Sequence, residues 1–310
     1  MIASSPFDLA LRAIPVTRRT LSVLGTTTRY WEYGDPHAAS TIVMVHGFRG
    51  DHHGLEPVVA QNVAGVRVIS PDLPGFGESS PFPVRTHDID AYAAWLASFV
   101  EQLAPSGRVV LLGHSFGSII VAAAMARGLP ADAVVLVNPI AAPALSGPRG
   151  VLTRLAVFYY WAGARLPERL GYALLQNRAI VRVMSVSMAK TRDRALRRWI
   201  HAEHDRYFCA FANRQVVLEA FTASVGHDVS EYARHIAVPT LLVAADRDDI
   251  TPLSAQHRLQ SLFPHASLTV IDGVGHLIHY EKPAAAAAAI TNFLAVPHPS
   301  TPRPSTPGPL

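Results

Sequence analysis

The chain has 310 residues, of which 49% are hydrophobic and 16% are charged, and its formal net charge is +4. This composition can bury a sizeable core and excludes disorder over most of the chain. Residues 140–238 hold 14 basic and 7 acidic residues, whereas the remainder holds 13 basic and 16 acidic residues. A local excess of this kind fits an anionic substrate, an anionic lipid surface or simply a solvated surface, and we expect no nucleic-acid partner.

The N-terminal region and the cysteine content indicate the cell compartment. Residues 1–14 lack a basic region followed by a long apolar run, so we expect neither a signal peptide nor a transmembrane helix. The single cysteine, Cys209, has no partner for an internal disulfide and no metal-ligand spacing around it. Together these features predict a cytoplasmic protein.

Apolar runs recur along the chain with segments of helical length between them. Residues 20–33 are expected to form one or two antiparallel strands at a sheet edge. Six further runs cover residues 41–45, 66–70, 109–112, 134–137, 240–245 and 267–271. Runs of this kind are typical of buried strands in a mostly parallel sheet with helices on both faces, so the sequence predicts a three-layer α/β fold.

The alternation of strands and helices stops after residue 138. No convincing strand follows up to residue 237, and helical stretches such as 151–164 and 192–220 are predicted instead. We interpret this segment as a helical cap, rich in aromatic residues, that packs on the core and roofs a pocket. The predicted parts are a first core part, the cap, a second core part and a disordered proline-rich tail, at residues 1–138, 139–237, 238–296 and 297–310.

Ser115 lies at the centre of the pentapeptide Gly-His-Ser-Phe-Gly at residues 113–117. The apolar run 109–112 precedes it and a helix-like stretch follows. A small residue two positions on either side allows a sharp strand-to-helix turn that exposes the serine hydroxyl. Ser115 is therefore the predicted nucleophile.

An unassisted serine hydroxyl is a weak nucleophile, so it needs a base and a group that orients that base. His276, beside Gly275, follows the predicted strand 267–271 and is the expected base. Three aspartates follow the strand 240–245, and we favour Asp248, then Asp246, then Asp249, because the acid must lie on the loop rather than on the strand. Both loops follow strand C-termini, where open parallel sheets place their chemistry.

Acyl transfer also needs hydrogen-bond donors where negative charge develops on the substrate oxygen. The backbone N–H of Phe116 is one expected donor, because it follows the nucleophile. The second is the N–H of Phe48, in the His46-Gly47-Phe48 loop after the strand 41–45, where Gly47 supplies the turn.

The cluster Asp51-His52-His53 is the remaining candidate site. Adjacent histidines point in different directions in an extended chain, and no third ligand follows at a useful spacing. We therefore expect rim residues near the oxyanion loop, and neither a metal nor a cofactor.

Taken together, these residues resemble the α/β-hydrolase family, and within it the members with a serine nucleophile and a helical cap. The resemblance covers about residues 18–296. It rests on five segments in the family's order, namely His46-Gly47-Phe48, residues 72–79, residues 113–117, Asp248 with Pro252, and Gly275-His276 with Glu281 and Pro283. It implies a cofactor-independent esterase that forms an acyl-enzyme on a small-molecule ester with a fairly apolar part.

Several alternatives stay open at this point. The same triad supports C–C bond hydrolysis, lyase chemistry or acyl transfer, and a non-catalytic receptor on this fold is a further reading. Haloalkane dehalogenases and epoxide hydrolases of this fold use an aspartate nucleophile, so Ser115 argues against both. Ser118 departs from the glycine or alanine of many relatives, and the cap carries no signature of one substrate. The basic cap, with aromatic residues 158–161, also suggests contact with a membrane surface.

Overall fold

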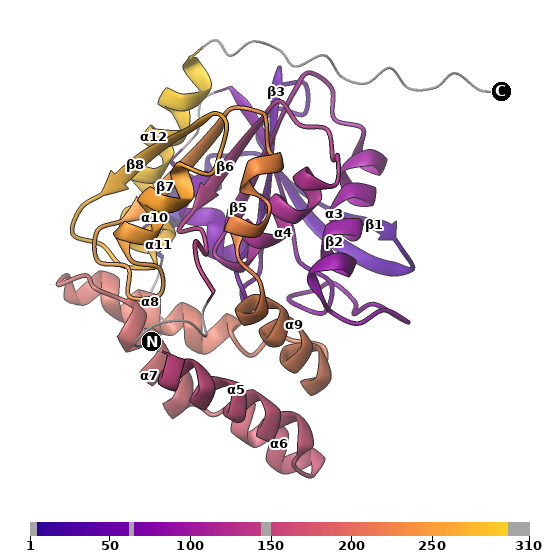
Figure 1. Cartoon of the computed structure of the whole chain (residues 1–310), viewed down its shortest axis with the longest axis vertical. Helices are drawn as coiled ribbons and strands as arrows, with labels where there is room; N and C mark the ends of the chain where they lie inside the picture. Colours follow the sequence, from indigo (N-terminus) through magenta and orange to yellow (C-terminus); the bar gives the residue numbers. More distant parts are fainter. Residues whose placement is uncertain (1–4, 62–64, 144–149, 297–310) are drawn as a thin grey trace.

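The computed structural model describes residues 5–61, 65–143 and 150–296, which form one eight-stranded sheet with helices on both faces (Figure 1). The strands are β1 (Val16–Val23), β2 (Thr26–Tyr33), β3 (Ser40–Val45), β4 (Val66–Pro71), β5 (Arg108–His114), β6 (Ala133–Val137), β7 (Thr240–Ala245) and β8 (Ala266–Ile271). Their order is β1-β2-β4-β3-β5-β6-β7-β8. The predicted three-layer α/β fold is confirmed, whereas the predicted tail at residues 297–310 lies outside the described residues.

The strand directions follow the expectation from the sequence. β3 to β8 pair in parallel, and β1 and β2 form an antiparallel edge, with β2 antiparallel to β4. The predicted edge segment 20–33 is therefore two strands, and the first begins earlier than expected, at Val16.

Apolar side chains fill both faces of the sheet. In β3, Val43 and Val45 belong to one core cluster, whereas Ile42 and Met44 belong to the other, because side chains alternate along a strand. The first cluster packs under α3 (Ile89–Leu103), α4 (Phe116–Ala126) and α10 (Leu253–Gln260). The second packs under α2 (Glu56–Val59), α11 (Ile278–Glu281) and α12 (Pro283–Ala295). Parallel strands buried on both faces explain the continuous apolar runs.

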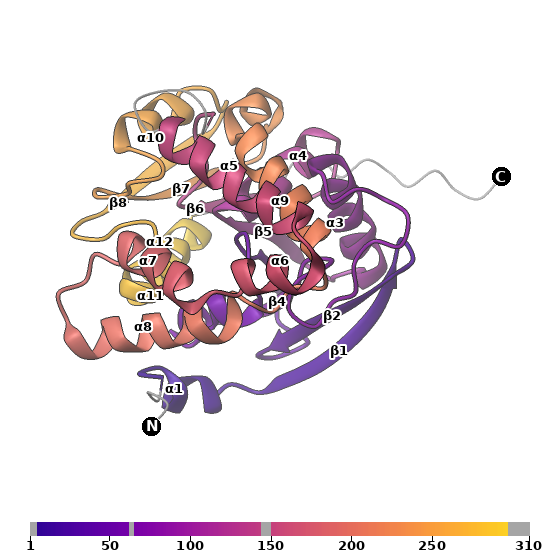
Figure 2. The same ribbon diagram turned by 90° about the horizontal axis from the view of Figure 1, so that it is seen from below.

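Five α-helices of the described chain lie between β6 and β7, and we call them the inserted helices. They are α5 (Gly150–Arg165), α6 (Glu168–Leu175), α7 (Arg178–Met188), α8 (Arg194–Tyr207) and α9 (Arg214–Gly226). Figure 1 shows them together at one end of the sheet, and Figure 2, seen from that end, shows them in front of it. The short elements α1 (Asp8–Arg12), η1 (His52–Leu55), η2 (Val229–Glu231) and η3 (Ala233–His235) complete the fold.

The helix predicted over residues 192–220 is wrong in one respect, because the structure divides it into α8 and α9. Residues 210–212 instead pair with residues 75–77, through Gly77 N–H to the Ala210 carbonyl and Ala212 N–H to the Gly75 carbonyl. The Asn213 side chain then caps the new helix by accepting the Val216 N–H at 2.9 Å. A long-range contact thus overrides the local helical pattern. Among the described residues, no helix is both long and apolar enough to cross a membrane.

Candidate active site

Ser115 lies in a strained turn between β5 and α4. Its φ of +52° and ψ of −118° are sparsely populated by non-glycine residues, at a cost of about 1 to 3 kcal/mol. A Cβ atom at Gly113 would stand 2.4 Å from the carbonyl oxygen of Gly117, and one at Gly117 would stand 2.2 Å from that of Val45. Close backbone approach therefore requires both glycines, and the turn leaves Ser115 partly exposed.

Ser118 holds this turn from the helix side. Its buried hydroxyl donates to the Ser115 carbonyl and accepts the N–H of Ile140 at 3.2 Å. Ile140 belongs to the segment that follows β6. The departure from glycine or alanine at this position therefore tightens the turn.

His276 lies between Ser115 and Asp248. Its Nε2 atom is 2.8 Å from Ser115 Oγ, and its Nδ1 atom is 2.8 Å from Asp248 Oδ2. The imidazole and the carboxylate are buried, with 4% and 6% of their residue surface exposed. The three residues follow β5, β7 and β8, so the carboxyl ends of parallel strands bring them into one line of hydrogen bonds.

The other two aspartates of the loop after β7 have different partners. Asp246 Oδ1 accepts the N–H of Val274 at 3.2 Å, which holds the loop that carries His276. Asp249 forms an exposed ion pair with Lys190. Within the described residues, Asp248 is the aspartate of this loop that bonds to His276.

The carboxylate of Asp248 is held in its charged form. Burial alone would raise its pKa, but the charge and hydrogen bond of His276, with the N–H groups of Ile250 and Thr251, hold that pKa below its usual value. Asn138 also donates to Asp248 Oδ2, at 3.0 Å. This contact of Asn138 was not predicted from the sequence, although the residue directly follows the apolar run of β6.

The loop after β3 brings a second set of groups close to Ser115. A Cβ atom at Gly47 would lie 3.3 Å from the Cβ of Ser115, so the backbone of this loop passes directly beside the turn. Neither the Phe48 amide nor the Phe116 amide donates a hydrogen bond within the described part of the chain. Two N–H groups near the serine are thus available to an oxygen of a bound molecule.

His46 fixes the shape of the same loop. Its Nε2 atom accepts the Leu73 N–H at 2.9 Å, so the proton is on Nδ1, which donates to the Gly47 carbonyl at 2.8 Å. Burial lowers the pKa of His46 and keeps the ring neutral. The ring therefore connects this loop to the one that follows β4.

Arg49 fastens this loop to the inserted helices. It is only 1% exposed, and its guanidinium donates to the carbonyls of Leu175, at 2.9 Å, and Phe208, at 2.8 Å. Leu175 ends α6 and Phe208 caps α8, so the cation lies at the negative ends of two helix dipoles. No local pattern in the sequence marks Arg49, because its partners lie more than a hundred residues away along the chain.

Aromatic side chains surround the loop that carries Phe48. Its ring centroid is 5.5 Å from that of Tyr160 in α5, 5.6 Å from that of Phe221 in α9, and 6.4 Å from that of Phe116. The surroundings of this loop are thus strongly apolar. A cavity of about 1320 Å³ lies elsewhere, between β8 and α12, and its lining includes none of the residues that the sequence analysis proposed for the site.

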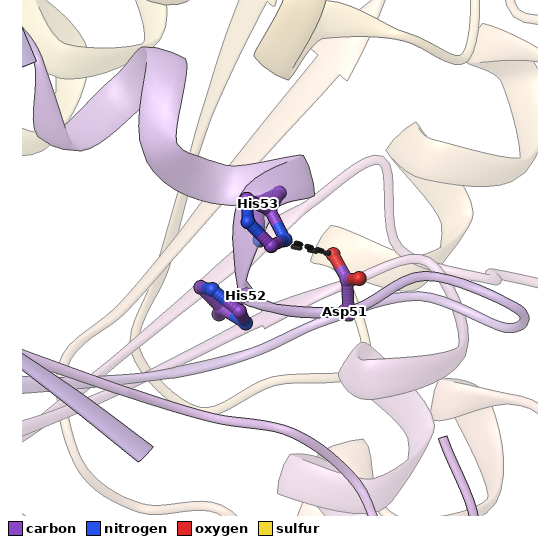
Figure 3. Close-up of side chains that lie close together, drawn as sticks. All are labelled: Asp51, His52 and His53. Atoms are coloured by element: carbon purple, nitrogen blue, oxygen red, sulfur yellow. Dashed lines mark hydrogen bonds and ion pairs between the residues drawn. The ribbon is translucent and has the colours of Figure 1, made fainter. Parts of the chain in front are cut away.

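The cluster Asp51-His52-His53 lies at the start of η1 (Figure 3). The expectation that its histidines diverge is wrong, because the chain turns here as a 3-10 helix and the two ring centroids are 3.8 Å apart. One ligand atom from each of the three residues falls within 4.8 Å of the others, as a metal site would require. However, each Nδ1 atom already bonds to a carboxylate, that of His52 to Asp72 at 2.9 Å and that of His53 to Asp51 at 3.2 Å.

The two histidine rings also pack against each other and against aromatic neighbours. Their planes are inclined by 37°, with the ring centroids 3.8 Å apart. His52 stacks on Trp31 of β2 and His53 stacks on Tyr207 of α8. This column of rings connects the sheet to the inserted helices, and the absence of a bound metal stays a prediction.

Because His114 and His204 are buried, we predict that the protein loses stability in acid. Burial, reinforced by a neighbouring histidine, lowers the pKa of each to about 3. The unfolded chain binds a proton at each near its ordinary pKa of 6.5, whereas the folded chain does not. Their stabilisation is therefore complete above about pH 6.5 and is lost as the pH falls toward 3, by about 1.4 kcal/mol per pH unit for each histidine.

Urea unfolding at pH 7, 6 and 5 measures this dependence. We expect the free energy of unfolding to fall more steeply with acid in the wild type than in His204→Gln. The exposed His257→Gln serves as the matched control and should keep the wild-type slope. An unchanged slope in His204→Gln would show that His204 does not stay neutral in the folded state.

Comparison with known proteins places the chain among hydrolases. A family model described as "Alpha/beta hydrolase family" matches residues 42–289. The chain is similar to Epoxide hydrolase A of Mycobacterium tuberculosis, with 25% identity over 90% of this chain and 97% of that protein. It is also similar to Lipase 1 of Psychrobacter immobilis, with 24% identity over 77% of this chain and 72% of that protein.

Solved structures show the same fold. A thermophilic esterase from Thermogutta terrifontis superimposes with a TM-score of 0.72, covering 90% of this chain and 98% of that chain at 22% identity. At this identity the likeness concerns the fold alone.

Proposed function

This chain belongs to the alpha/beta hydrolase family, and we propose that within the family it is a cofactor-independent serine hydrolase that cleaves carboxylic esters. The observation that carries this proposal is the line of hydrogen bonds from Asp248 through His276 to Ser115, each 2.8 Å long. A nucleophile, a base and an orienting acid in that order are what acyl transfer requires.

The reaction begins when Ser115 Oγ attacks the ester carbonyl. His276 Nε2 accepts the hydroxyl proton, while Asp248 keeps the Nδ1 proton in place and stabilises the imidazolium. The carbonyl oxygen becomes negatively charged and receives hydrogen bonds from the Phe48 and Phe116 N–H groups. His276 then gives its proton to the departing alcohol, which leaves the acyl group on Ser115.

Water completes the cycle. His276 Nε2 takes a proton from a water molecule as that water attacks the acyl-enzyme, and a second tetrahedral intermediate forms on the same two amides. Its collapse releases the carboxylic acid and returns the proton to Ser115 Oγ. Each proton transferred in this cycle passes through His276 Nε2, so the proposed steps balance without a metal or a cofactor.

The substrate we propose is a small ester with a fairly apolar part. The rings of Phe48, Tyr160 and Phe221 pack against one another at the oxyanion loop, and burial of apolar substrate surface beside the half-buried Phe48 would favour binding. The inserted helices supply two of these rings and act as a cap in this scheme. The similarity to Lipase 1 of Psychrobacter immobilis supports an ester as the bond cleaved.

A substrate panel tests the bond that is cleaved. We expect turnover of p-nitrophenyl butyrate, weaker turnover of a vinylogous diketone, and none of styrene oxide. Epoxide opening in this fold proceeds through an aspartate nucleophile, as noted above, whereas residue 115 is a serine. Diketone or epoxide turnover in the absence of ester hydrolysis would replace the proposed activity with one of the alternatives.

A further inference from the structure

The outward face of α5 carries an unusual row of side chains. Arg154, Phe158, Trp161 and Arg165 are spaced by four, three and four residues, which places them on one stripe of a helix. All four are exposed, Phe158 by 63% and Trp161 by 48% of their surface. The two rings stack on each other with centroids 5.7 Å apart. A pair of aromatic rings is thus presented to solvent between two arginines.

The neighbouring helices α6 and α7 also carry exposed apolar side chains and arginines. Figure 2 shows α5, α6 and α7 in front of the sheet, and Figure 1 shows the same three helices farthest from it. Leu170 of α6, with Val183 and Val186 of α7, are exposed by 58%, 69% and 56%. The three helices carry five arginines and one acidic residue, Glu168.

Exposed apolar side chains together with an excess of arginines indicate what kind of partner would bind this surface. Exposure of large apolar side chains to water costs free energy, and an apolar patch of this kind usually marks a contact site. A second copy of the same face would bring arginine against arginine, and like charges across an interface disfavour association. A negatively charged surface with an apolar layer beneath it complements both the charges and the rings.

We propose that the face formed by α5, α6 and α7 binds the surface of an anionic lipid membrane. Phe158 and Trp161 enter the boundary between headgroups and acyl chains, and Arg154 and Arg165 contact the lipid phosphates. Long arginine side chains can reach the headgroups while their stems lie along the apolar layer. This role goes beyond the proposed esterase activity and does not depend on it.

Vesicle co-sedimentation of the full chain tests this surface. The vesicles contain either phosphatidylcholine alone or equal parts of phosphatidylcholine and phosphatidylglycerol. We expect clear binding to the mixed vesicles, and binding weakened by about tenfold or more in Phe158→Ser/Trp161→Ser. Arg154→Gln/Arg165→Gln should lose about tenfold at low salt and should depend less on salt than the wild type.

The control is Val84→Ser, because Val84 is 93% exposed on a loop outside the inserted helices. This variant should bind like the wild type, and thermal unfolding shows that each variant is folded without reference to ester turnover. Equal binding by wild type and Phe158→Ser/Trp161→Ser, or no binding by the wild type, would overturn the proposal. A wild-type dimer that this double variant converts to monomer, without vesicle binding, would overturn it in favour of a second copy.

Discussion

Replacement of Ser115 by alanine should lower kcat on p-nitrophenyl butyrate by about 10⁴-fold to 10⁶-fold, with KM changed by only a few-fold. The reason is that His276 Nε2, 2.8 Å from Ser115 Oγ, then has no hydroxyl to activate. The apolar surroundings and the two amides stay in place, so substrate binding is largely retained. Steady-state kinetics on the purified variant measure both constants.

The control for this variant is Ser254→Ala, on the exposed side of α10. It removes a hydroxyl of the same size and should leave both constants unchanged. Equal turnover by wild type and Ser115→Ala, after correction for the uncatalysed rate, would mean that another residue is the nucleophile.

Replacement of Asp248 by asparagine should lower kcat by about 10³-fold to 10⁴-fold. Oδ1 of Asp248 accepts the N–H groups of Ile250 and Thr251, at 2.8 and 3.1 Å, so the amide oxygen of asparagine would occupy that position. Its NH2 group would then face His276 Nδ1 and force the proton onto Nε2. A protonated Nε2 cannot accept the proton of Ser115.

The matched controls are Asp246→Asn and Asp249→Asn, on the same loop. Asp249→Asn weakens an exposed ion pair with Lys190, away from His276, so its kcat should stay within about twofold of the wild type. Asp246→Asn weakens the support of the His276 loop, and we expect a loss of less than about tenfold. A large loss in Asp246→Asn with little change in Asp248→Asn would assign the acid to Asp246 instead.

The fold could be predicted because parallel strands covered on both faces leave continuous apolar runs, such as residues 109–112. The sharp turn at Ser115, the proposed nucleophile, could be predicted for a related reason, since Gly113 and Gly117 mark a backbone approach that admits no Cβ. The preference for Asp248 came from its place on the loop, beyond the end of β7. These signals are local, so a single sequence contains them.

The features that the sequence did not reveal depend on distant partners. The break between α8 and α9 arises from pairing with residues 75–77, more than 130 residues away. Arg49 is held by helix ends that lie 126 and 159 residues away along the chain. The close approach of the His52 and His53 rings departs from the prediction because the chain forms a 3-10 helix here and not an extended backbone.

Mass spectrometry of the folded protein after reaction with a fluorophosphonate probe tests the central claim most directly. Such a probe forms a stable adduct only with an activated nucleophile that has a base beside it. We expect a single adduct, located on Ser115 by peptide mapping, that forms in the wild type and far more slowly in His276→Gln. An adduct on a different residue, or an unlabelled Ser115 in protein that still hydrolyses esters, would contradict the assignment.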